Sequence, residues 1–230
     1  MGSTYVVSDL HSCYSKFIKS IPSDTSHLII NGDCFNKGRE QEEMFRWVMK
    51  NRKNPKYTFI LGNTEIRLNN ELVRHFYPSK TSLYMDWLGT HSGYANKNIT
   101  NVVIDLIENK KMFTVDDVFD LLQNWYRWYY RFEDWIIAHA SWELNKTPEA
   151  QSKINLVYDT QRNLQKWKKL NYELKIPRRY AETRFIFGHT PVQSIKGPNA
   201  DPPVILHDRF FYIDNGIFKT ANKMFYLKIK

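Results

Sequence analysis

The sequence predicts an α/β protein organised around a parallel sheet. Short apolar runs alternate with amphipathic stretches through the first part of the chain, which is the pattern of a parallel sheet. Several apolar runs end abruptly in Asp, His or Asn, and ligands gather at the carboxyl ends of such strands. The breaks are VVSDLHS (6–12), LIINGDC (28–34), FILGNTEIR (59–67), WIIAHAS (135–141) and FIFGHTP (185–191).

The first sixty residues contain the elements of this sheet in order. Strands are predicted at 4–8, 27–31 and 57–61, because each is a short β-rich run bounded by polar residues. Helices are predicted at 13–21 and 40–52 from their apolar spacing. The second helix begins with acidic residues and ends with basic ones, which suits the helix macrodipole.

Residues 66–133 are predicted to be mostly helical. Thr114 and Asp117 have the spacing of a capping box that opens the stretch VFDLLQNWYRWYYRF. We expect this block to form a helical cap or insertion over one edge of the sheet. The aromatic stretch 124–135 is interleaved with arginines, so it fits either a base-stacking platform or, more simply, an amphipathic helix packed on the core.

The remainder of the chain returns to strands, after a basic segment at 161–179 that we expect to start as a helix. Because the later runs follow one another through tight turns, they predict an antiparallel or mixed second sheet. We therefore expect one compact domain, residues 1–230, with two sheets. These runs are 134–139, 184–188, 203–207, 209–214 and 223–229.

Composition limits the class of partner. Lys and Arg number 33 against 24 Asp and Glu, a formal charge of +9. This balance favours anionic partners such as nucleic acid, nucleotides or phosphorylated protein, although solubility alone explains it equally well. The two cysteines suggest no metal or disulfide framework, so we expect a reduced, cytoplasmic protein. No apolar run approaches the ~20 residues that cross a bilayer.

The residues at the strand ends form a set of metal-ligand types. Each one alone has an ordinary explanation as a turn or hydrogen-bonding residue. Together, carboxylate, imidazole and amide oxygens suit divalent Mn, Fe or Zn, and the lack of a thiolate argues against a structural zinc site. The set is Asp9, His11, Asp33, Asn63, His139 and His189.

In this order, the motifs DLH, GDCFNKG, GNTE, AHA and GHTP resemble those of the calcineurin-like metallophosphoesterases. The similarity is greatest to the compact branch of phage-type serine/threonine protein phosphatases and diadenosine-tetraphosphate hydrolases. It leaves residues 75–130 largely unaccounted for. The resemblance implies a four-layer αββα sandwich, here with a helical insertion, and a phage origin with a host-cytoplasmic location would fit it.

The resemblance also implies the role of each ligand. Asp9 and His11 would hold one metal, Asn63, His139 and His189 the other, and Asp33 would bridge them. The cofactor would be two ions of Mn, Fe, Zn or Ni, with Mn favoured in vitro. Hydrolysis would use a water activated between the ions, without a phosphoenzyme. A monomer or weak homodimer is expected.

The chain departs from the family pattern at its proton donor. Thr64 replaces the family's histidine in the Gly-Asn-His-Glu motif, and Asn36 replaces the aspartate that partners that histidine. A threonine hydroxyl has no pKa near neutral pH, and loss of a general acid typically costs ~10²–10⁴ in rate. The cost is smallest for good leaving groups, so Thr64 predicts nucleotide polyphosphates, activated diesters or aryl phosphates as substrates.

Phosphate binding is altered too. Lys37 replaces an arginine, which keeps the charge but loses the bidentate fork. Thr160 stands at the second arginine position, and Arg162, two residues on, is the candidate replacement. We therefore assign catalytic roles to Asp33, Asn63, Thr64 and Lys37, and substrate binding to Lys37 and Arg162.

Two alternatives remain open. A serine/threonine protein phosphatase could take its proton from a displaced donor such as His75 or His91, although these are more simply exposed histidines. A catalytically weakened, metal-bound module could instead bind a phosphorylated ligand, as the changes at Asn36, Lys37, Thr64 and Thr160 suggest. Retention of all the ligand types favours an enzyme over such a module.

Overall fold

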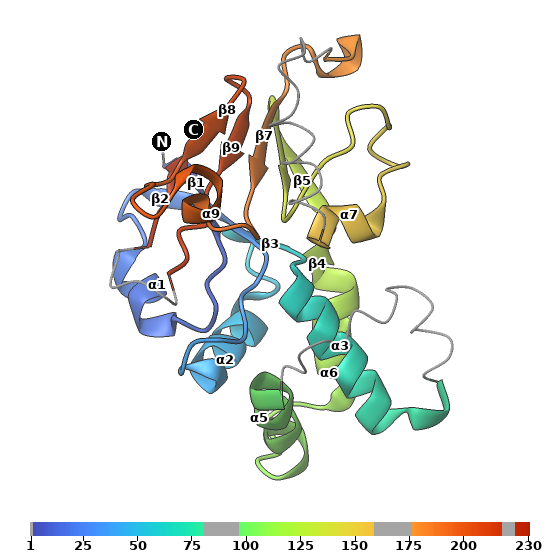
Figure 1. Ribbon diagram of the computed structural model, residues 1–230. Coiled ribbons are helices and arrows are strands. Elements are labelled where there is room, and N and C mark those ends of the chain that lie inside the picture. Colours follow the sequence, from blue (N-terminus) through green and yellow to red (C-terminus); the bar gives the residue numbers. More distant parts are fainter. Residues whose placement is uncertain (1, 81–96, 159–175, 218–223) are drawn as a thin grey trace.

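Two stacked sheets dominate the computed structural model, which describes residues 2–80, 97–158, 176–217 and 224–230. Figure 1 shows the strands gathered in one part of the molecule and the helices α2, α3, α5 and α6 grouped beside them.

The first sheet has the order β10-β1-β2-β3-β4. Neighbouring strands from β1 to β4 run parallel, and β10 pairs antiparallel with β1. The parallel arrangement confirms the prediction from the first sixty residues. The strands are β1 (Ser3–Ser8), β2 (Thr25–Asn31), β3 (Tyr57–Ile60), β4 (Tyr126–Arg127) and β10 (Leu227–Lys228).

The second sheet is mixed, as predicted, with the order β5-β6-β7-β9-β8. Its three central strands are parallel, and an antiparallel strand closes each edge. Because β6 and β7 are parallel neighbours, their carboxyl ends lie at the same end of the sheet. The strands are β5 (Tyr129–Phe132), β6 (Trp135–Ala138), β7 (Arg184–Phe187), β8 (Val204–Leu206) and β9 (Phe210–Tyr212).

Alternation along the strands builds the core in layers. Successive side chains of a strand point to opposite faces, so one set from each sheet meets in the space between the sheets. This inner layer consists of Val6, Ile29, Ile60, Trp135, Ile137, Ile186 and Ile213, all nearly fully buried. Their strand neighbours, such as Val7, Ile30 and Phe185, pack in a second cluster toward the helices. Each fully buried side chain of this kind contributes about 1.5–3 kcal/mol.

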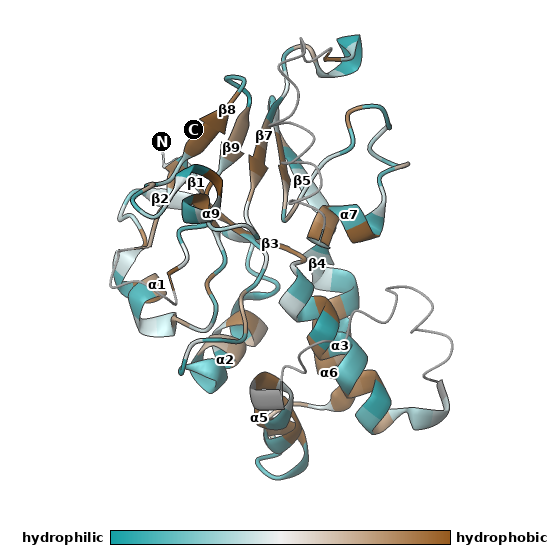
Figure 2. Cartoon of the chain, in the orientation of Figure 1, coloured by the Kyte–Doolittle hydropathy of each residue, from teal (hydrophilic) through white to brown (hydrophobic). Residues whose placement is uncertain are grey.

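Helices cover the outer faces of the sheets. In Figure 2 the helices α2 and α3 each have a brown and a teal side, as helices that pack on a core do. On the first sheet's side, α5 contacts both α2 and α3. The helices here are α1 (Tyr14–Ser20), α2 (Gln41–Asn51), α3 (Asn63–Phe76), α5 (Lys97–Glu108) and α6 (Val115–Asp120).

The second sheet is covered by shorter helices, α7 (Lys153–Tyr158) and α9 (Val192–Lys196). Leu156 and Val192 of these helices are buried in the cluster that also holds the outer aromatic side chains of β7 and β9. Helix, sheet, sheet and helix thus form four layers, which confirms the predicted fold class. Short helical turns also occur at Pro78–Lys80, Leu121–Trp125 and Arg178–Tyr180.

Two predictions of secondary structure are wrong. The helix expected to continue through 126–132 ends at Asp120 in a π-helical turn, and the aromatic run that follows forms β4 and β5. Tyr, Trp and Phe have high strand propensity, and pairing with β3 and β6 outweighs their helical spacing. The last strand, β10, joins the first sheet rather than the second.

Other predictions remain untested. The basic segment 161–179 lies mostly outside the described residues. That residues 66–133 form a cap or insertion stays a prediction. In the described part of the chain, no helix combines the length and apolar character that a membrane span requires.

Candidate metal centre

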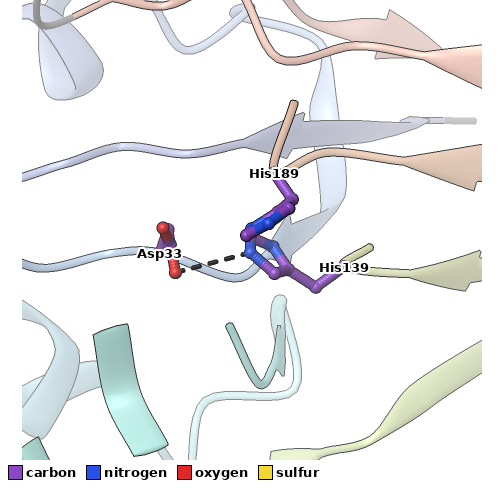
Figure 3. A group of neighbouring side chains, drawn as sticks. All are labelled: Asp33, His139 and His189. Carbon is purple, nitrogen blue, oxygen red and sulfur yellow. Dashed lines mark ion pairs between the residues drawn. The ribbon is translucent and has the colours of Figure 1, made fainter. Parts of the chain in front are cut away.

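The predicted ligands all lie at the carboxyl ends of parallel strands. Asp9 and His11 follow β1, Asp33 follows β2, and Asn63 is the first residue of α3, just after β3. His139 and His189 follow β6 and β7 of the second sheet. Figure 3 shows these two imidazoles next to each other, with Asp33 facing them. The stacking of the two sheets therefore brings together residues that are far apart in sequence.

Hydrogen bonds between loops fix this arrangement. The loops after β1 and β2 are joined by His11 N, which donates to Asp33 O at 2.9 Å. The loops after β6 and β7 are joined by Gly188 N, which donates to His139 O at 2.8 Å. The sheets are joined at the centre by His189 N, which donates to Asp9 Oδ2 at 2.9 Å.

Several ligand residues adopt a left-handed backbone. Their φ angles are +56° at Asp9, +43° at His11, +51° at Asp33 and +63° at His189. Such conformations cost about 1–3 kcal/mol each and concentrate at functional sites. Gly32, with φ +75°, makes the turn before Asp33 possible, because a Cβ there would lie 2.4 Å from His139 Nδ1.

The side chains form two clusters that share Asp33. The first cluster is Asp9, His11 and Asp33, and the second is Asp33, Asn63, His139 and His189. The carboxylate and imidazole atoms of each cluster lie within 4.8 Å of one another. Asp33 Oδ2 is 3.8 Å from His11 Nε2, and Asp33 Oδ1 is 3.4 Å from His139 Nε2. One carboxylate oxygen faces each cluster, which is the geometry a bridging ligand needs.

In the second cluster, acceptor atoms converge. His139 Nδ1 lies 2.9 Å from the Asn31 carbonyl oxygen, which can only accept, so Nδ1 carries the hydrogen. The lone pair on Nε2 of the neutral ring then faces Asp33 Oδ1, and Asn63 Oδ1 at 3.3 Å. Asn63 Oδ1 also lies 2.8 Å from His189 Nδ1. A cation is the natural partner for such a set.

The first cluster contains an unsatisfied acceptor. Asp9 Oδ2 accepts from Ser8 Oγ and from the His189 backbone, whereas the buried Asp9 Oδ1 has no hydrogen-bond partner in the described part of the chain. A buried acceptor without a donor costs free energy that a bound cation would recover. The donor types and their convergence fit two divalent ions in this centre.

Burial tunes the protonation of these groups. It lowers the pKa of His11 to about 4 and, together with neighbouring His139, the pKa of His189 to about 3. Both rings are therefore neutral at neutral pH, with a lone pair available to a metal. Burial and the charge of Asp33 raise the pKa of Asp9. Burial also acts to raise the pKa of Asp33, but the neighbouring imidazoles of His139 and His11 outweigh it and hold that pKa at about 2.

Thr64 lies beside the centre but presents its backbone to it. Its N–H donates to Asp33 Oδ1 at 2.9 Å, and its hydroxyl donates to Glu65 Oε1 at 3.2 Å. The side chain is 1% exposed. Asn36, the other altered position of the expected acid pair, is half-buried, and its N–H donates to Gln41 Oε1 at 3.1 Å. No imidazole stands at either position.

Lys37 lies at the centre, whereas the other predicted substrate-binding residue falls outside the described residues. Lys37 Nζ is 2.8 Å from His11 Nε2. Arg162 and Thr160 belong to the segment 159–175, which is not described.

Glu65 is a site residue that the sequence analysis did not assign. Its fully buried carboxylate accepts backbone N–H groups from Gly62 at 2.9 Å, Asp33 at 3.0 Å and Cys34 at 2.8 Å. It thereby ties the start of α3 to the loop that carries Asp33. Its position three residues after Gly62, at a helix start, is the spacing of a capping box and could have revealed it.

Comparisons with known proteins agree with this geometry. Residues 2–216 match the model of the calcineurin-like phosphoesterase family. The fold is similar to that of a cold-active protein-tyrosine phosphatase from a psychrophilic Shewanella species, with a TM-score of 0.56 and 14% identity over 100% of this chain and 76% of the other. It is equally similar to a putative diadenosine tetraphosphatase, with a TM-score of 0.56 and 14% identity over 99% of this chain and 93% of the other.

No curated protein matches the chain. At this level of identity the solved structures show a shared fold alone, whereas the family model covers nearly the whole sequence. The chain belongs to the calcineurin-like phosphoesterase family.

Proposed function

We propose that this protein is a metal-dependent phosphoesterase that hydrolyses phosphate esters or anhydrides with good leaving groups. The observation that carries the proposal is the contrast at the centre. Acceptor atoms of six predicted ligands converge there, while the position of the expected proton donor holds a threonine whose hydroxyl donates to Glu65. Nucleotide polyphosphates, activated diesters and aryl phosphates are the substrates that suit such a centre.

Different groups of the protein would bind the metal ions, hold them together and supply positive charge. The first cluster and the second cluster would each hold one divalent ion, of which manganese is our choice for assays. When bound, such ions supply Lewis-acid activation of water and of the phosphoryl oxygens. Asp33 would keep the two sites together, and the Thr64 N–H would orient its carboxylate. Lys37 contributes positive charge at the exposed side of the first cluster.

The leaving group would depart without a proton from an imidazole. Among the described residues, the three histidines at the centre are all predicted ligands, so each would need its lone pair for a metal. An alkoxide leaves poorly under these conditions, whereas a phenolate or a nucleoside phosphate leaves well.

The alternative of a serine/threonine phosphatase with a displaced proton donor loses one of its candidates. His75 lies near the end of α3 and pairs with Glu108 at 3.0 Å. Asn63 starts the same helix, and twelve residues of helix separate the two by about 18 Å. His75 therefore cannot reach the leaving group. His91, the other candidate, lies outside the described residues.

The alternative is a metal-bound module that binds a phosphorylated ligand, and the residue types at Asn36, Lys37 and Thr64 are the evidence for it. It predicts ligand binding without turnover. Assays of an aryl phosphate, a dinucleoside polyphosphate, a cyclic nucleotide and an alkyl phosphomonoester, each with Mn²⁺, separate the two. We expect turnover of the first two and little of the alkyl ester. The control is the variant Asp33→Asn, in which turnover of every substrate should be lost. Binding of all four without turnover would reject the proposed function.

A further inference from the structure

Lys37 reaches from the surface into the first cluster. It lies in the loop that follows Asp33, with φ +64°, and it is an exposed residue. Its Nζ nevertheless lies 2.8 Å from His11 Nε2. His11 itself is 1% exposed, so the ammonium group meets a buried ring at the inner end of a flexible, solvated stem.

The nitrogen that Lys37 contacts is the one a metal would bind. His11 Nδ1 lies 3.3 Å from the Phe35 carbonyl oxygen, which can only accept, so Nδ1 carries the hydrogen of the neutral ring. The lone pair is then on Nε2, and Lys37 donates to it. The same Nε2 is 3.8 Å from Asp9 Oδ1 and 3.8 Å from Asp33 Oδ2, the oxygens of the first cluster.

Lysine and a divalent ion cannot both hold this position. An ammonium at hydrogen-bond distance from Nε2 uses the lone pair that the ion needs, and two cations this close repel one another. The second cluster differs, because there the corresponding nitrogen, His139 Nε2, faces the oxygens of Asp33 and Asn63.

We propose that Lys37 is a built-in competitor for the metal of the first cluster. The two ions therefore bind unequally: the second cluster fills first, and the first cluster fills only when Lys37 swings out toward solvent. This rests on the proposed function in so far as both clusters bind metal. It adds that the chain carries its own monovalent cation for the first cluster, so this cluster needs a higher Mn²⁺ concentration than the second to bind its ion.

The inference is tested by titrating Mn²⁺ alone into the metal-free protein, by calorimetry and by electron paramagnetic resonance. In the wild type we expect a tight step of one ion, with the spectrum of an isolated Mn²⁺, followed by a weak step. Lys37→Met keeps the length of the side chain and removes the charge. It should tighten the weak step by about 10- to 100-fold, as expected for loss of a hydrogen bond from a charged donor. The tight step should change little.

A spin-coupled signal should then appear in Lys37→Met at two ions per chain, at Mn²⁺ concentrations where the wild type shows none. The matched control is Lys19→Met, which removes the same charge from an exposed position on α1 and should behave as the wild type. Lys37→Gln serves as a second uncharged variant and should reproduce Lys37→Met.

Three outcomes would overturn the inference. Two equally tight ions with a coupled signal in the wild type would do so while leaving the proposed function intact, as would weak steps that stay the same in both Lys37 variants. Failure of every variant to bind Mn²⁺ at the second cluster would reject the proposed function and this inference with it.

Discussion

The two sides of the centre have changed to different degrees relative to the family pattern. On the metal side, the residues that the resemblance marks as ligands are all present, and the structure brings their donor atoms together. On the substrate side, Thr64, Asn36 and Lys37 replace a histidine, an aspartate and an arginine of that pattern. In the proposed function, the first side would hold the metal ions, whereas the second would contact the leaving group and the phosphate.

Under the proposed function, this difference concerns the departure of the leaving group rather than the activation of water. Metal ions can activate the water and neutralise phosphate charge whatever the leaving group is, but a proton donor matters only when the leaving group is poor. If the centre acts as proposed, with its metal ligands intact and threonine at the position of the acid, it should be selective rather than inactive. Variants of Asp33 on the metal side, of Glu65 between the two sides, and of Thr64 on the substrate side should therefore have different effects.

The largest effect is expected from Asp33→Asn, because Asp33 faces both clusters. The amide loses the negative charge that would hold two cations together. At Mn²⁺ concentrations that fill both clusters of the wild type, the variant should bind fewer than two ions per chain. Hydrolysis of an aryl phosphate should drop by about 10³-fold or more, since metal ions supply several kcal/mol of transition-state stabilisation. Elemental analysis measures the bound metal, and steady-state kinetics measure the rate of hydrolysis. Unchanged metal content and rate would end the assignment of Asp33 as a bridge.

A second test breaks the connection between the two sides. Glu65→Ala leaves three buried backbone N–H groups without their acceptor. Each such group costs about 1–3 kcal/mol, so the free energy of unfolding should fall by about 3 kcal/mol or more in urea denaturation. Glu65→Gln keeps one oxygen acceptor and should lose less.

The control for this test is Glu71→Ala on the same helix, where the half-buried carboxylate pairs with Arg74 at 2.7 Å. It should cost no more than about 1 kcal/mol, as for most ion pairs near the surface. Equal losses for Glu65→Ala and Glu71→Ala would show that the hydrogen bonds of Glu65 do not hold the centre.

A smaller effect is expected from rebuilding the acid. Thr64→His combined with Asn36→Asp restores the family pair and should raise kcat/KM for an alkyl phosphomonoester by about 10²-fold. The value for an aryl phosphate should change much less. Thr64→His alone should do less than the double variant, because its imidazole lacks the carboxylate that orients it and raises its pKa. The ratio of the two kcat/KM values, with metal content checked, is the measurement. An unchanged ratio in the metal-loaded double variant would mean that the missing pair does not set selectivity.

The sequence predicted which residues meet at the centre because each follows a recognisable strand. Asp9, Asp33 and His139 come directly after apolar runs, and parallel strands in the same sheet must place such residues at one edge. The fold class followed from the same runs. The stacking of the two sheets, which brings His139 and His189 to Asp33, came from the resemblance to the family rather than from the pattern of the runs.

The remaining features depend on contacts that a sequence pattern does not encode. The run 126–132 has helical spacing of aromatics, yet its strands form because β3 and β6 offer free edges. The final strand pairs with β1 in the first sheet, which adjacency in the sequence did not suggest. The contact of Lys37 with His11 depends on a left-handed backbone and a long side chain. From the sequence alone, Lys37 could be predicted only as a positive charge that would bind phosphate.

The central claim is that this centre hydrolyses phosphoesters without protonating the leaving group. The most direct measurement is kcat/KM of the Mn²⁺-loaded wild type for a series of phosphomonoesters that runs from acidic phenols to simple alcohols, plotted against the pKa of the leaving group. We expect a steep fall in kcat/KM as that pKa rises, with alkyl esters close to inert. A shallow dependence, with alkyl esters turned over nearly as fast as aryl esters, would contradict it and would require a proton donor at the centre.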